Sequence, residues 1–214
     1  MLTIAYVAFV AAFAALFWQS MLVYRARRSS YTLLLAIVLA GLAYDTFTIL
    51  IGRFLGEGTL LQTLNAGRYL VHGIATPSMM IFAFGVLRSG NIGWAQSRAA
   101  HIGVCVFTTL LIALGIYQDV IALELAPRTV FDTLRYVNEG GMKGPPIPAL
   151  LTIFFLIAAG ILLGRGTGWW GLTIGALLMF LAAGGGMGDR FYLGNLGEVA
   201  LGIANVLTAR KFLS

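Results

Sequence analysis

Residues 41–72, GLAYDTFTILIGRFLGEGTLLQTLNAGRYLVH, contain the end of one apolar helix, a glycine-rich turn and the start of a second apolar helix. Ionisable side chains interrupt the apolar pattern of both helices, at Asp45 in the first and at Arg68 and His72 in the second. An ionisable side chain inside a membrane span costs about 3 kcal/mol or more, so its presence needs a partner or a function. We therefore expect the functional site in this region.

The composition of the rest of the chain indicates a polytopic membrane protein. Of 214 residues, 59% are hydrophobic and 10% are charged, and the mean hydropathy is +0.90. Soluble globular domains contain about 25% charged residues. Uncharged runs of roughly 20 residues recur in continuous blocks, which favours membrane helices over a barrel of alternating strands. We predict an all-α fold in which residues 1–214 form a single transmembrane domain.

Seven membrane spans are predicted, over residues 3–24, 31–52, 67–87, 99–117, 147–163, 168–184 and 193–210. The fifth and sixth spans are short and are joined by residues 164–168, which predicts a tight helical hairpin, with a re-entrant pair as the alternative. No basic segment precedes the first span and no cleavage site follows it, so we expect a retained helix rather than a signal peptide. The single cysteine, Cys105, excludes an internal disulfide.

The charges predict the orientation. The connections after spans one, three and five, together with the C-terminus, contain basic residues and no acids: Arg25, Arg27, Arg28, Arg88, Arg98, Arg165, Arg210 and Lys211. Because basic loops remain in the cytoplasm, the N-terminus is expected outside and the C-terminus in the cytoplasm. This placement explains the net charge of +6 without a nucleic-acid partner. We expect an integral protein of a bacterial inner membrane or an equivalent plasma membrane.

Residues 118–146 form the longest polar connection and lie on the predicted outer side. Apolar residues recur at helical spacing over residues 128–140, at Val130, Phe131, Leu134 and Val137. This spacing predicts an amphipathic helix on the outer leaflet. The alternative is a cap over a cavity, with Tyr136, Asn138 or Glu139 pointing inward.

Three predicted helices each have a face of small and polar residues at intervals of three or four. These faces are Gly41, Asp45, Thr48 and Gly52; Asn65, Arg68, His72 and Thr76; and Asn195, Glu198, Gly202 and Asn205. We predict that Asp45, Arg68, His72 and Glu198 surround one polar pocket that opens outward. The alternative is that Asp45 or Glu198 pairs with Arg68 only to fix the order of the helices.

The residue types leave carboxylate chemistry as the best candidate. No span contains a lysine that could hold retinal, and motifs for zinc hydrolysis, magnesium–diphosphate binding or nucleotide phosphates are absent. A carboxyl group in an apolar pocket keeps its proton to a higher pH and can act as an acid near neutrality. We therefore predict Asp45, Glu198 and His72 as catalytic residues, without a cofactor or metal. The predicted substrate-binding residues are Arg68, Tyr44, Asn65, Tyr69, Asn195 and Asp189.

The sequence Ala43-Tyr44-Asp45 resembles a motif of the small seven-span integral-membrane terpene cyclases of meroterpenoid and indole-terpenoid biosynthesis. That family shows Ala-Trp-Glu at this place in the second span and another acid late in the chain, where Glu198 or Asp189 stands here. The resemblance implies acid-initiated cyclisation of an isoprenoid without a metal, an isomerase or lyase reaction.

The predicted function is that of a membrane enzyme acting on a lipidic substrate, with an isoprenoid as one candidate. Its expected partner is a membrane lipid or a lipid-soluble small molecule. One alternative is a proton- or ion-conducting channel or transporter that uses the same groups. Such a protein needs a polar route to the cytoplasmic side, for which only Gln19, His101, Thr173 and Asn205 are available. Another alternative is a non-catalytic membrane subunit that binds a lipid or pigment.

Overall fold

The computed structural model describes residues 2–140, 146–186 and 188–213. Within these ranges it contains seven α-helices, which confirms the predicted all-α class. They are α1 (Leu2–Arg27), α2 (Ser30–Leu55), α3 (Thr59–Ser89), α4 (Arg98–Ile116), α5 (Ile147–Thr167), α6 (Gly171–Gly185) and α7 (Tyr192–Phe212). A hairpin of two short strands, β1 (Leu125–Val130) and β2 (Thr133–Asn138), precedes α5.

Five of the described helices are long and apolar enough to cross a membrane: α1, α2, α3, α5 and the helix over Arg98–Ile121, which comprises α4 and a π-helical turn at Tyr117–Ile121. The helix α6 is apolar but has 15 residues, and α7 is less apolar than the five. These helices support an integral membrane protein. Which end of the bundle faces outward stays a prediction.

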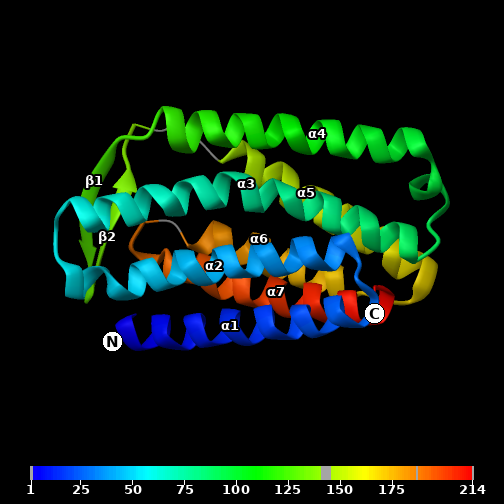
Figure 1. Ribbon diagram of the computed structural model, residues 1–214, viewed down its shortest axis with the longest axis horizontal. Coiled ribbons are helices and arrows are strands. Elements are labelled where there is room, and N and C mark those ends of the chain that lie inside the picture. Colours follow the sequence, from blue (N-terminus) through cyan, green and yellow to red (C-terminus); the bar gives the residue numbers. More distant parts are fainter. Residues whose placement is uncertain (1, 141–145, 187, 214) are drawn as a thin grey trace.

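Six helices form a ring, and the seventh lies outside it. Each helix of the ring contacts the next in the order α1, α2, α3, α5, α6, α7, and α7 contacts α1. The remaining helix, α4, packs mainly on α3. Successive helices run in opposite directions along the bundle, so the N-terminus and the β-hairpin share one end and the C-terminus lies at the other (Figure 1). We call the first of these the hairpin end. It is the end predicted to lie outside.

The central helix is α3, which contacts α2, α4 and α5 and is the most buried of the five long helices. Met80, Phe82, Phe84 and Leu87 are fully enclosed. The helix begins at Thr59, whereas the sequence predicted a span from residue 67. Hydropathy marks only the apolar part of a helix, and the first two turns of α3 contain polar residues that lie beside the hairpin.

The helices α5 and α6 form the predicted tight hairpin, with Gly168 in the left-handed conformation at the turn (φ 75°). Close packing depends on Gly160, where a Cβ atom would lie 2.5 Å from the backbone nitrogen of Thr173. Gly164 faces the indole of Trp170 in the same way. The small residues therefore bring the two helices together.

The predicted amphipathic helix over residues 128–140 is wrong, because this segment forms the antiparallel hairpin instead. Its threonine, valine and tyrosine residues favour strands. Phe131 adopts a positive φ of 52° in the two-residue turn, and Asp132 is held there by the start of α1. The carboxylate of Asp132 accepts hydrogen bonds from the backbone nitrogens of Leu2, at 2.8 Å, and Thr3. Contacts distant in sequence thus override the local helical spacing.

Asp132→Ala is expected to lower the unfolding temperature, because it removes the acceptor for the first backbone N–H groups of α1. Thermal unfolding of the purified protein in detergent measures the change. Glu57→Ala is the control, since Glu57 is an exposed acid at the same end. Equal unfolding temperatures for the two variants would contradict the capping role of Asp132.

Candidate functional site

A polar pocket of about 260 Å³ lies at the hairpin end, between α2, α3, α7 and the hairpin. Six of the residues predicted for the site line it: Asp45, Arg68, Tyr69, His72, Asn195 and Glu198. The three polar helix faces therefore meet, as their spacing suggested. They meet because each sits on a helix that faces the interior of the ring near the same end.

Asp45 and Arg68 form a buried ion pair between α2 and α3. The distance from Arg68 Nε to Asp45 Oδ1 is 2.9 Å, and each residue is 8% exposed. A second guanidinium nitrogen donates to Oδ1 of Asn65 at 2.7 Å, and the amide of Asn65 donates to the carbonyl of Leu61. Asn65 thus lies behind the pair and orients Arg68, while the two charges balance each other.

Glu198 has a different environment. Its Oε2 accepts a hydrogen bond from the amide nitrogen of Asn195 at 3.1 Å, and Oδ1 of Asn195 accepts one from the hydroxyl of Tyr6 at 2.7 Å. The tyrosine orients the amide so that its N–H group faces the carboxylate. Within the described residues no cationic side chain lies within 4 Å of Glu198, in contrast to Asp45. The two carboxyl groups of the pocket are therefore chemically distinct.

His72 and Asp119 are two further titratable side chains in the lining of the pocket. In the part of the chain that the structure describes, neither ring nitrogen of His72 has a hydrogen-bond partner, and the residue lines the pocket. Asp119 comes from the π-helical turn after α4. It was not predicted for the site, although an acid directly after an apolar helix is a usable signal.

Arg135 enters the pocket from β2 and was also missed. Its guanidinium carbon lies 3.6 Å from the centroid of the Phe191 ring, a cation–π contact. Burial lowers the pKa of Arg135 to about 10, and the positive charge of Arg68 acts in the same direction. The group remains charged at neutral pH. The sequence could not indicate this role because it depends on the strand pairing.

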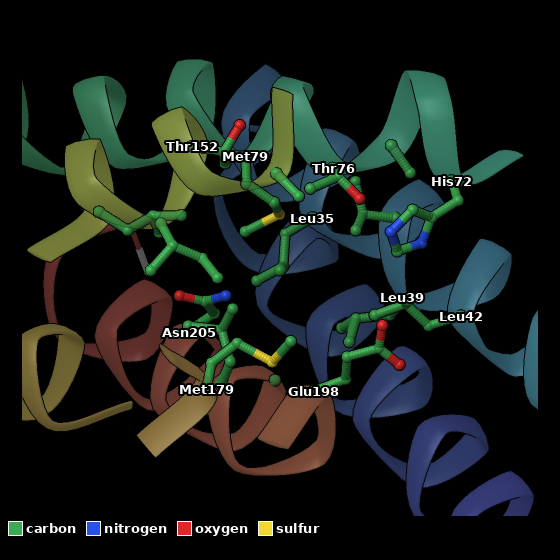
Figure 2. Close-up of a pocket in the computed structure, with 17 residues that line it drawn as sticks. Leu35, Leu39, Leu42, His72, Thr76, Met79, Thr152, Met179, Glu198 and Asn205 are labelled. Carbon is green, nitrogen blue, oxygen red and sulfur yellow. The ribbon is translucent and has the colours of Figure 1, made fainter. Parts of the chain in front are cut away.

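An apolar chamber of about 80 Å³ continues from the polar pocket into the ring, between α2, α3, α5, α6 and α7. His72 and Glu198 line both spaces. Figure 2 shows these two side chains at one end of the chamber and Asn205 at the other, with leucine and methionine side chains between them. Polar and apolar space therefore meet at His72 and Glu198.

Three predicted residues lie outside the pocket lining. Asn65 supports Arg68 from behind. The hydroxyl of Tyr44 donates to the carbonyl of Leu64 at 2.8 Å, which ties α2 to α3. Asp189 is exposed and pairs with Arg128 at 3.3 Å. Among the described residues there is no group of three or more histidine, cysteine or acidic side chains that could hold a metal ion.

Comparison of the chain with protein-family models, curated proteins and solved structures finds no match. The likeness to membrane terpene cyclases stays a prediction from the sequence motif.

Proposed function

We propose that this chain is an integral membrane enzyme that acts on a lipidic substrate, with an isoprenoid as the leading candidate, by carboxylate acid–base chemistry. One observation carries the proposal: His72 and Glu198 line both a polar pocket and the apolar chamber that continues from it. A lipid that places its polar end in the pocket and the adjoining part of its chain in the chamber brings the atoms between them to these two side chains.

The environments of the two carboxyl groups suggest how they divide the work. Glu198 has an amide donor and no paired cation, so it is suited to hold a proton and to deliver it at the edge of the chamber. Asp45 is paired with Arg68 and lines the pocket, where its carboxylate is placed to stabilise positive charge on the substrate. His72 is placed to accept the proton that the cationic intermediate loses as the product forms, and return of this proton to Glu198 across the pocket completes the cycle. One proton enters and one leaves, so the overall reaction is an isomerisation.

The lining also suits a cationic intermediate. Tyr69 adds an aromatic ring to the wall of the pocket, and ring faces stabilise cations. This is the chemistry implied by the resemblance of Ala43-Tyr44-Asp45 to the terpene cyclase motif. The basic residues at the other end of the bundle favour a plasma or bacterial inner membrane location with the hairpin end outside.

Glu198→Gln is expected to lower turnover at least about 100-fold, the usual loss when a general acid is removed. The wild-type protein and the variant are placed in nanodiscs with a total isoprenoid and polar lipid extract, and mass spectrometry follows lipid conversion. Glu57→Gln removes an exposed acid at the same end and is expected to keep the wild-type rate. Undiminished conversion by Glu198→Gln would overturn the proposal.

The same experiment separates the alternatives. A lipid that co-purifies with the wild-type protein and is never converted indicates a lipid-binding subunit. Proton flux into liposomes that is lost in Glu198→Gln, without any lipid conversion, indicates a conducting protein. The chamber lining gives the conducting alternative little support, because Asn205 is the main polar group at its far end.

A further inference from the structure

Arg135 differs from the other arginines that approach the pocket or the hairpin. Three of these form ion pairs: Arg53 with Asp132 at 3.4 Å, Arg68 with Asp45 at 2.9 Å, and Arg128 with Asp189 at 3.3 Å. In the described ranges no carboxylate lies within 4 Å of Arg135. Of these four arginines it is the one that is partly buried and also lies over an aromatic ring, that of Phe191. Among the described residues its charge therefore has no directly paired carboxylate, and Asp45 acts on it only from a longer distance.

The surroundings of Arg135 leave hydrogen-bonding capacity unused. Its Nε atom is buried and has no hydrogen-bond partner among the described residues. Phe191 covers one face of the guanidinium but can accept no conventional hydrogen bond, and Arg68 adds a second positive charge nearby. A partly buried guanidinium without an anion is costly, so the protein gains when an anion arrives from outside.

The stability of the hairpin does not explain the arginine. Arg135 on β2 is directly opposite Arg128 on β1 in the strand register. Two like charges in directly opposite positions destabilise a pair of strands. Arg128 relieves the repulsion by turning to Asp189 at the surface, while Arg135 lines the pocket. The position of Arg135 thus serves the pocket rather than the hairpin.

We propose that Arg135 binds an oxyanion at the polar end of the lipid substrate. The planar guanidinium presents two parallel N–H donors that match the geometry of a carboxylate or phosphate. Asp119 shares the pocket, so an oxyanion with one negative charge is repelled less than a dianion. The apolar chamber below, at about 80 Å³, takes the methylene groups nearest that polar end. The ligand class is therefore a single-chain amphiphile with a singly charged oxyanion, a refinement that rests on the proposed function of this pocket.

Binding of three probes to the full protein in nanodiscs of zwitterionic lipid tests the proposal. Dodecyl methyl phosphate has the chain and one fixed negative charge, 1-dodecanol has the chain alone, and dimethyl phosphate has the anion alone. The wild-type protein is expected to bind dodecyl methyl phosphate at least about 10-fold more tightly than dodecanol, because charge-assisted hydrogen bonds form only with the phosphate. Dimethyl phosphate is expected to bind most weakly of the three.

Arg135→Gln is expected to weaken binding of dodecyl methyl phosphate at least about 10-fold and to leave dodecanol binding unchanged. Arg135→Lys keeps the charge but loses the paired donors, and is expected to fall between the two. Arg128→Gln is the matched control, since it removes an arginine from the same hairpin outside the pocket, and it is expected to bind all three probes normally.

Three results would overturn the proposal. Wild-type affinity of Arg135→Gln for the phosphodiester would remove the role of the arginine. Equal losses for phosphodiester and alcohol would show that the arginine acts only on structure. Equally tight binding of dimethyl phosphate would assign the site to a free soluble anion. Glu198→Gln is expected to bind the probes normally, so failure of this inference and failure of the proposed chemistry give different patterns.

Discussion

Asp45→Ala is expected to lower the free energy of unfolding by about 3–5 kcal/mol, the largest stability effect of any single change considered. The substitution leaves the Arg68 guanidinium charged and 8% exposed, without its partner at 2.9 Å. The loss comes mainly from this uncompensated charge and only in part from the contact itself. Thermal and denaturant unfolding in detergent micelles measure it.

A double mutant separates these two contributions. Asp45→Ala combined with Arg68→Met removes both charges and keeps much of the arginine's volume, so it is expected to be more stable than Asp45→Ala alone. Asp189→Ala breaks the exposed pair with Arg128 and is expected to cost less than about 1 kcal/mol. An additive loss in the double mutant would show that the buried pair does not act as a unit.

Gly52→Val is expected to lower the stability by about 1–3 kcal/mol and also to weaken binding of the phosphodiester probe. Any Cβ atom at Gly52 would overlap the backbone carbonyl oxygen of Leu134, which is part of β2. Since backbone must move, the hairpin is displaced, and Arg135, the next residue, moves with it. Probe affinity and unfolding temperature are measured together, because overpacking alone would change only the second.

Gly103→Ala provides the control for this change. Gly103 lies in α4, and a Cβ atom added there meets no other atom within 4 Å. The control is expected to keep wild-type probe binding and to gain stability slightly, because alanine favours a helix over glycine. Normal probe binding by Gly52→Val would show that the hairpin does not position the arginine.

Much of the fold could be predicted because a membrane helix is a continuous block of apolar residues long enough to cross a bilayer, and such a block is visible in the sequence. The beginning of α3 was missed because its first turns are polar and rest beside the hairpin. The hairpin itself was mistaken for a helix. Its four apolar residues fit helical spacing, whereas the contact of Asp132 with the start of α1, which helps to hold the turn, is distant in sequence.

The candidate site was partly predictable for a related reason. Ionisable groups such as Asp45, Arg68 and Glu198 are costly in apolar helices, so their spacing alone indicates that they face an interior space. Arg135 carries no such signal, since polar residues are common in connections, and the position of Asp119 directly after an apolar helix is a weaker one. Asp189 fitted the late acid of the sequence motif, yet it lies at the surface beside Arg128.

The amino-acid sequence was sufficient for the class of the protein, for its helices and for the meeting of three polar faces, because hydropathy and helical period are local properties. The three-dimensional packing alone revealed the apolar chamber below Glu198 and the entry of Arg135. A chamber is space left between five helices, and strand register sets which side chains of a hairpin point inward. Both are set by contacts between residues far apart in the chain.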